Sequence, residues 1–263
     1  MDAKVRLFVD QPLGMGQAVA LDESQAGYLF SVMRLGVGAG VRLFNGKSGE
    51  WRARVVEATK RRGVLVCEAQ VGPQVAPPDL WLVFPPLRKE RTAFVVEKAV
   101  ELGVARIVPV RTAFTQGERW RGDKARAHAV EAAEQCGATF VPDLAEIAPL
   151  EAVLEAWPVG RVLLWADEAL AGAQLTGAEG TEAEGTGAEG TGAERTGAEM
   201  SRGTPSALLI GPEGGFSDKE RAVLRGCAFA QPIRLGPRIL RAETAAIAAL
   251  ALWQARYGDW GGW

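Results

Sequence analysis

The chain has 263 residues, of which 48% are hydrophobic and 24% are charged. This length supports one large domain or two ordinary ones, and the composition is typical of globular proteins rather than disordered or fibrous ones. No apolar run reaches the roughly 18 residues that a membrane span needs. The first ten residues also lack a long apolar segment. We therefore expect no signal peptide, no membrane anchor and a cytoplasmic location.

Cysteine and histidine are scarce, which limits the chemistry available. Cys67, Cys136 and Cys227 lie far apart in sequence, and His128 is the only histidine. This spacing argues against a disulfide framework and against a zinc site built from cysteines. A site with several histidine ligands is excluded, and a Ser-His-Asp triad would have to use His128. We expect no metal.

Charge is unevenly distributed along a chain whose formal net charge is −2. Residues 1–75 carry ten Lys/Arg against seven Asp/Glu, a net of +3, and residues 88–126 carry ten against five, a net of +5. Much of the compensating acid lies in 176–200, where a five-residue repeat such as TGAEG runs five times. Because this stretch has almost no large apolar side chains, we predict a disordered acidic insertion over 173–203.

The N-terminal part favours short strands. An Asn-Gly turn at 45–46 separates two β-type runs, and residues 25–33 favour a short helix. We predict a small β-barrel over 1–74, followed by a proline-containing linker near 72–79. The strand-like segments are 6–10, 18–21, 41–46, 51–59 and 63–71.

From residue 80 onward, apolar strand-like runs alternate with helix-like segments. This alternation predicts an α/β domain over 75–263 with a parallel sheet covered by helices. The expected strands are 80–86, 105–110, 161–165, 206–210 and 232–235, and the expected helices are 89–102, 123–136, 217–225 and 242–257. Ser217 and Glu220 form a capping-box pattern at the third helix.

Two glycine-containing turns follow predicted strands of this domain. The first, Gly211–Phe216, reads GPEGGF and matches neither the P-loop nor the dinucleotide fingerprint. It is either a tight turn or a site where backbone N–H groups approach a ligand closely. The second, Leu235–Thr244, reads LGPRILRAET. Because both follow strands, we expect them to meet at the carboxyl edge of the sheet and to form one pocket.

A basic cluster begins the first helix of this domain. Arg88, Lys89 and Arg91 lie where the helix macrodipole disfavours positive charge. This mismatch indicates a use for the charges, such as contact with phosphate.

Four segments together resemble the ribosomal RNA small subunit methyltransferase E family, of the SPOUT class. They read EKAVELGV (97–104), EAAEQCG (131–137), GPEGGF and LGPRILRAETA. The resemblance implies a PUA-like N-terminal barrel and a C-terminal parallel sheet with a trefoil knot. It also implies S-adenosylmethionine as cofactor, a homodimer, and methylation of N3 of a uridine in 16S rRNA of the small ribosomal subunit.

The resemblance also implies roles for individual residues. Arg241 would orient or polarise the uracil, or else form an ion pair at the dimer interface, and Glu213 would be a base or a cofactor contact. The expected cofactor-binding residues are Leu164, Gly211, Pro212, Glu213, Gly214, Gly215, Leu235, Gly236, Ile239, Leu240 and Thr244. The expected RNA-binding residues are Arg6, Arg34, Arg88, Lys89, Arg91 and Lys98.

The chain departs from the family pattern at three positions. Ala138 stands where the family commonly has Arg, Ala242 where it often has Thr, and Tyr28 where it often has His. Two other functions therefore stay open. One is a SPOUT methyltransferase with another RNA target, such as a ribose 2′-hydroxyl, and the other is a non-catalytic RNA-binding ribosome assembly factor.

Overall fold

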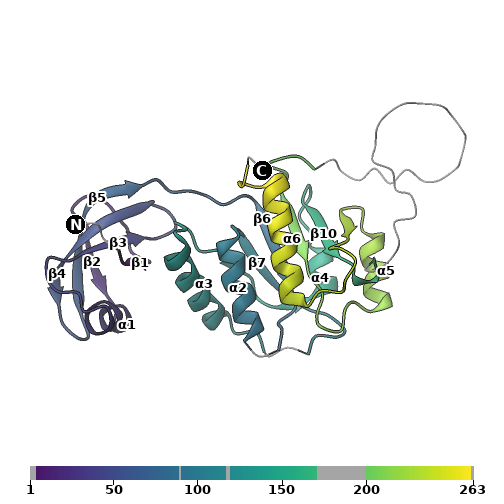
Figure 1. The fold of residues 1–263 in the computed structure, drawn as a ribbon, viewed down its shortest axis with the longest axis horizontal. Coiled ribbons are helices and arrows are strands. Elements are labelled where there is room, and N and C mark those ends of the chain that lie inside the picture. The colour runs from purple at the N-terminus through teal and green to yellow at the C-terminus, as the bar shows by residue number, and fades with distance from the viewer. Residues whose placement is uncertain (1–3, 89, 117–118, 171–199, 262–263) are drawn as a thin grey trace, which may run out of the picture. The chain divides into compact units, whose positions relative to one another are not determined.

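A computed structural model describes residues 4–88, 90–116, 119–170 and 200–261 of the chain (Figure 1). The predicted acidic insertion lies outside these residues as far as position 199, and so does Lys89. The described chain divides into two compact units. The first comprises Met1–Pro78, Ala93–Ile107 and Arg121–Ala145, and the second comprises Asp79–Thr92, Val108–Trp120 and Glu146–Trp263. The boundary at residues 74–75 stays a prediction.

The N-terminal sheet has five strands in the order β1-β3-β4-β5-β2. β1 pairs with β3 in parallel, and the other neighbours are antiparallel. Its alternating side chains bury a core that includes Val9, Val19, Leu29 and Val55, all 0% exposed. The strand-rich N-terminal module is thus confirmed. β1 and β2 are the outer strands of the sheet, and in the described part no pairing joins them to close it. The strands are β1 Arg6–Phe8, β2 Ala18–Leu21, β3 Gly40–Phe44, β4 Glu50–Ala58 and β5 Gly63–Gly72.

The helical segment of this module differs in kind from the prediction. It consists of α1 (Glu23–Ala26) continued by a π-helix over Gly27–Val32. It begins earlier than expected because Asp22 caps it, accepting the Gln25 N–H at 2.8 Å. Tyr28 lies in the π-helical turn.

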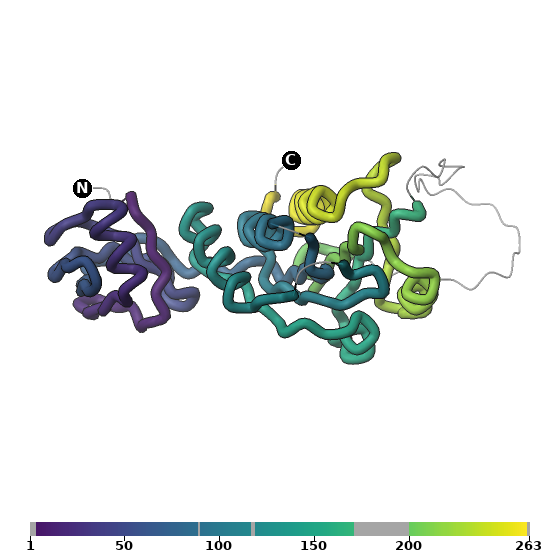
Figure 2. The backbone as a smooth tube through the Cα atoms, turned by 90° about the horizontal axis from the view of Figure 1, so that it is seen from below, coloured from purple at the N-terminus to yellow at the C-terminus, as the bar shows by residue number. Residues whose placement is uncertain are grey.

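The second sheet has seven strands, in the order β12-β10-β11-β6-β7-β8 with β9 beside β7. Figure 2 shows the backbone from a second direction. Its described registers are all parallel, as predicted. The trefoil knot stays a prediction. The strands are β6 Leu80–Phe84, β7 Arg106–Arg111, β8 Asp143–Leu144, β9 Ala148–Pro149, β10 Val162–Ala166, β11 Ser206–Leu209 and β12 Ala230–Ile233.

Five α-helices follow in the described chain: α2 Arg91–Glu101, α3 Gly122–Cys136, α4 Leu150–Glu155, α5 Asp218–Gly226 and α6 Ala242–Tyr257. The predicted capping box of α5 is present, with Ser217 N–H donating to Glu220 Oε2 at 2.8 Å. α5 packs on β12 and α6 on β11. The sequence missed α4, β8 and β9, which are too short to show a period. No described helix is long and apolar enough to cross a bilayer.

Arg6 of β1 holds the C-terminal end of α3. Its Nε lies 2.6 Å from Glu50 Oε1, and its Nη atoms donate to the carbonyls of Ala133 (2.6 Å) and Ala138 (2.9 Å). The side chain is 11% exposed. The last carbonyls of a helix, such as that of Ala133, lack partners within it, and Ala138 lies two residues beyond the end of α3. The Arg6 guanidinium bonds both carbonyls. Ala138 meets Arg6 through its backbone, a contact that any residue type can make. A contact of Arg6 with RNA stays a prediction.

We expect Arg6→Ala to lower the free energy of unfolding by about 3 kcal/mol, because it removes the nearer of the two arginines that pair with Glu50 and leaves the carbonyls at the end of α3 without their donor. Urea denaturation measures this loss. Arg54→Ala is the matched control, because Arg54 also pairs with a glutamate, Glu68, but is 51% exposed; it should cost little. Equal losses in the two variants would contradict a structural role for Arg6.

The ionisation of Glu134 makes the stability of the first unit depend on pH. Burial raises the pKa of the Glu134 carboxyl above its ordinary value, and Glu131 adds to this, while the Phe8 N–H and Arg6 act in the opposite direction. A raised pKa means that the folded state holds the proton more tightly than the unfolded state. The carboxyl therefore favours folding below its unfolded pKa, and this contribution is lost as pH rises through the folded pKa.

Glu134→Gln removes this titration and keeps an oxygen for the Phe8 N–H, which Glu134 accepts at 2.9 Å. We expect the variant to gain stability relative to the wild type as pH rises from 4 to 7. Unfolding curves at both pH values test this. A stability difference that does not change with pH, or that changes in the opposite direction, would exclude Glu134 as the source.

Candidate functional site

The first glycine turn links β11 to α5 and depends on the absence of side chains. Gly215 has φ +71°. A Cβ at Gly215 would collide with the Glu168 carboxylate, and one at Gly211 would lie 3.0 Å from the Phe216 ring. The positive φ and the contact with Glu168 thus favour glycine at 215, whereas a side chain at 211 would have to displace the Phe216 ring. The backbone of the turn is left open to a ligand.

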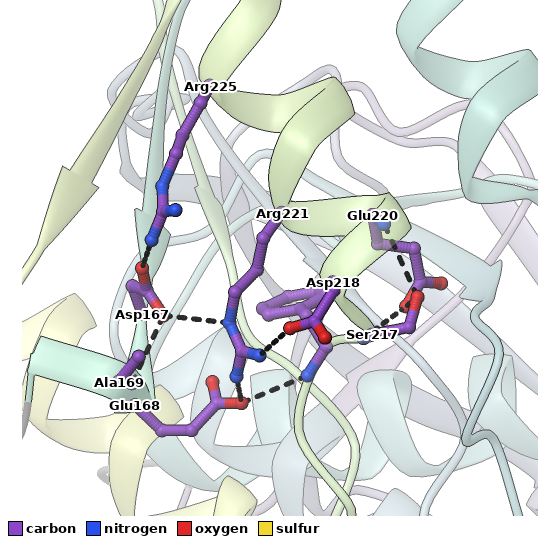
Figure 3. A network of polar contacts seen from close by, with 9 residues as sticks. Asp167, Glu168, Ala169, Ser217, Asp218, Glu220, Arg221 and Arg225 are labelled. Atoms are coloured by element: carbon purple, nitrogen blue, oxygen red, sulfur yellow. Dashed lines mark hydrogen bonds and ion pairs between the residues drawn. The ribbon is translucent and has the colours of Figure 1, made fainter.

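A network of ion pairs and hydrogen bonds holds this turn in place (Figure 3). Glu168 Oε1 accepts the Phe216 N–H at 3.0 Å and also bonds Arg221. Arg221 Nε reaches Asp167 Oδ1 at 3.2 Å, and Arg225 reaches Asp167 Oδ2 at 3.1 Å. The Asp167 side chain is 1% exposed. Burial opposes the charge of Arg221, but the two carboxylates outweigh it and raise its pKa above the ordinary value.

The second glycine turn links β12 to α6. Gly236 has φ +95°, and its carbonyl accepts a hydrogen bond from Arg234 Nε at 3.2 Å. Arg241 is the N-cap residue of α6, but its side chain does not cap the helix. Among the residues that the structure describes, the Arg241 guanidinium has no polar partner, so its charge is available to a ligand.

A cavity of about 230 Å³ lies between the two turns and the segment that follows β10. β10, β11 and β12 are adjacent and parallel, so the three segments meet at one carboxyl edge, as expected of ligand sites in such sheets. Nine predicted residues line it: Gly211, Pro212, Glu213, Gly215, Leu235, Gly236, Ile239, Leu240 and Arg241.

Three predicted cofactor residues lie elsewhere. Gly214 borders an adjoining cavity, and Leu164 borders a third one beside α6. Thr244 is exposed on α6, between Ala242 and Ala245, which both line the cavity.

The sequence analysis missed an acidic pair and the residues around it. Asp167 and Glu168 line the cavity, and so do Ala166, Ile210, Ile233, Arg238, Ala242 and Ala245. A signal was present, because Asp167 and Glu168 come one residue after the predicted strand 161–165 and so had to lie at the same sheet edge.

A second cavity of about 410 Å³ adjoins the first at Glu213, which lines both. Its other lining residues are Arg88, Arg91, Phe114, Gln116 and Gly214. Glu213 Oε1 accepts the Arg88 backbone N–H at 3.2 Å and lies 3.7 Å from Arg91. Arg91 also lies 3.5 Å from Glu243, at the start of α6. One arginine thus joins the two glycine turns.

The remaining predicted RNA-binding residues are dispersed. Arg34 is exposed and has φ +53°. Lys98 pairs with Glu101 at 2.6 Å and lies over the Phe94 ring. No group of three or more metal-ligating side chains occurs within the described ranges.

Comparison with known proteins connects this geometry with a family. A model of an RNA methyltransferase domain matches residues 75–254, and a model of an RNA methyltransferase PUA domain matches residues 21–66. The ribosomal RNA small subunit methyltransferase E of Rickettsia conorii is 25% identical, over 94% of this chain and 93% of its own. That of Buchnera aphidicola subsp. Schizaphis graminum is 27% identical, over 97% of each chain.

Solved structures give the same result. The ribosomal RNA small subunit methyltransferase E of Neisseria gonorrhoeae, bound to S-adenosyl methionine, superposes with a TM-score of 0.73 at 25% identity, over 97% of this chain and 98% of that one. A putative methyltransferase of Legionella pneumophila, in complex with the same cofactor, superposes with a TM-score of 0.77 at 26% identity, over 98% of this chain and 100% of that one. Because the RNA methyltransferase model matches well over half of the chain, the protein belongs to the RNA methyltransferase family.

Proposed function

We propose that the protein is an S-adenosylmethionine-dependent methyltransferase that methylates N3 of a uridine in 16S rRNA. The observation that carries this is the cavity between two glycine turns at the carboxyl edge of the sheet, in a chain of the RNA methyltransferase family. Relatives along its whole length are named as ribosomal RNA small subunit methyltransferase E, and two similar structures hold this cofactor.

The first cavity suits the cofactor chemically. Ile210, Ile233, Leu235 and Ile239 provide apolar surface for an adenine ring. The glycine turns expose backbone groups that can bond its polar edge, and the Glu168 carboxylate is an acceptor for hydroxyl or ammonium groups. When bound, S-adenosylmethionine supplies a methyl group on a positively charged sulfur, ready for in-line displacement.

The chain's own residues would then position and activate the base. Uridine N3 must lose its proton before it attacks, and negative charge develops on the uracil O2 and O4. The unpartnered Arg241 guanidinium, on the cavity wall, is suited to stabilise that charge. Glu213, which borders both cavities, is the candidate to accept the proton or to contact the cofactor. The N3–carbon bond forms as the sulfur–methyl bond breaks.

RNA binding and assembly complete the proposal. Because N3 lies on the pairing edge, the uridine must be unpaired or flipped out of a helix. The PUA-type domain and the basic residues of the N-terminal half would hold the surrounding RNA through its phosphates and shape. We further propose that the enzyme acts in the cytoplasm as a homodimer.

Product analysis tests the activity directly. We expect the purified protein with S-adenosylmethionine to form N3-methyluridine in 30S subunits taken from a strain that lacks this modification. Mass spectrometry of the nucleosides identifies the product. A 2′-O-methylated nucleoside would instead favour the other RNA target, and tight RNA binding without any methylation would favour an assembly factor.

We expect Gly215→Ala to raise the dissociation constant for S-adenosylmethionine by at least about tenfold. The new Cβ strains a backbone with positive φ and displaces Glu168 from the turn. Gly160→Ala is the matched control, because Gly160 has φ +82° but nothing lies within 4 Å of its added Cβ. Calorimetric titration of both variants decides the matter. If both bound the cofactor as the wild type does, the cavity would not be its site.

A further inference from the structure

The second cavity has the features of a seat for a single base. We propose that it holds the target uracil, swung out of the RNA, with Phe114 as the stacking surface and with Arg88 and Gln116 as the hydrogen-bond donors that recognise its oxygens. This rests on the proposed function and adds the residues that select the base. The cavity borders the first one at Glu213, as transfer between two bound molecules requires.

Phe114 has the exposure and the support of a stacking residue. It lies in the loop after β7, and it is 43% exposed although it is a large apolar side chain. Gly214 lies against it, since a Cβ at Gly214 would come within 3.1 Å of Phe114 Cβ. The glycine turn therefore supports the aromatic residue at the cavity wall. Proteins commonly hold unstacked bases on such aromatic faces.

Arg88 and Gln116 place hydrogen-bond donors side by side at the cavity wall. Arg88 Nη2 bonds Gln116 Oε1. Because a guanidinium can only donate, the oxygen of the Gln116 amide must face Arg88, which leaves the Nε2 donors of Gln116 for a ligand. The other Arg88 N–H groups are donors too. The ligand that this pair fits presents acceptor oxygens.

Uracil has that pattern and cytosine does not. Uracil carries carbonyl oxygens on both sides of N3, whereas cytosine carries an amino group in place of O4. Donors that face an amino group are left unpaired, which is a strong basis for rejection. The same donors also stabilise the charge that reaches O2 and O4 when N3 loses its proton. Arg88 and Gln116 would thus serve both recognition and activation of the base, together with Arg241 on the wall of the adjoining cavity.

Phe114 and Gln116 are the two lining residues whose substitution tests base binding most directly. Arg91 is engaged by Glu213 and Glu243, so its loss would disturb both glycine turns. Phe114 and Gln116 are exposed, and substitutions there should leave the fold intact. Phe94→Ala is a matched control, because Phe94 is also an exposed phenylalanine, at 40%, and does not line this cavity.

Single-turnover methylation of unmodified 30S subunits, with saturating S-adenosylmethionine and limiting subunits, tests the seat. We expect Phe114→Ala to lower the rate at least about tenfold and Phe114→Trp to retain most of it. Gln116→Glu, which replaces the donors by acceptors, should lower the rate by a similar factor. Phe94→Ala should stay within about twofold of the wild type, and cofactor affinity should not change in the Phe114 and Gln116 variants.

Two results would overturn the proposal. One is a wild-type rate in both Phe114→Ala and Gln116→Glu, and the other is a loss in Phe114→Ala that also weakens cofactor binding by the same factor. The wild-type product, identified separately by mass spectrometry, tests the proposed function. If that product is another methylated nucleoside, the uracil assignment fails even where Phe114→Ala lowers its formation, and the seat then belongs to that nucleoside's base.

Discussion

The absence of a side chain at residue 215 is the constraint on which the candidate site depends. The space that a Cβ would fill is occupied by the Glu168 carboxylate, which bonds the next backbone N–H in the turn. That carboxylate is held by Arg221, and Asp167 fixes Arg221 in turn. The first turn, the ion pairs of Glu168, Arg221 and Asp167, and helix α5 therefore hold one another in place. Together they set the shape of this wall of the cavity.

A second set of charges connects the two turns. Arg91 lies between Glu213 of the first turn and Glu243 in the first turn of α6, where the second glycine turn ends. The proposed cofactor cavity and the proposed base seat share Glu213, so a displacement of Arg91 would disturb both cavities. On the proposed function, the same residues would position both the cofactor and the base, which suits a reaction in which alignment supplies most of the rate.

The local parts of this site could be predicted from the sequence, whereas its long-range parts could not. The GPEGGF and LGPRIL turns and the Ser217–Glu220 capping box follow from glycine content and helix-start signals, which act over a few residues. Glu168 braces a turn 48 residues further along the chain, and no local pattern reports such a contact.

Arg6, Arg91 and Phe114 illustrate other limits of prediction from the sequence. Arg6 bonds the carbonyl of Ala133 in α3 and that of Ala138 just beyond it, 127 and 132 residues away in sequence, and no local pattern reports these contacts. Its contact with RNA stays a prediction. Phe114 and Gln116 lie in a loop with no periodicity, so only the cavity reveals them. Arg91 lies in a basic cluster whose sequence does not show the two carboxylates that engage it.

The most direct test of the account is a crystal structure of the protein with S-adenosylhomocysteine, the product of methyl transfer. The account predicts that the ligand occupies the cavity between Gly211–Gly215 and Leu235–Arg241, with Glu168 still bonded to the Phe216 N–H. A ligand bound outside that cavity, or a first turn that has released Glu168 in order to bind it, would contradict the account.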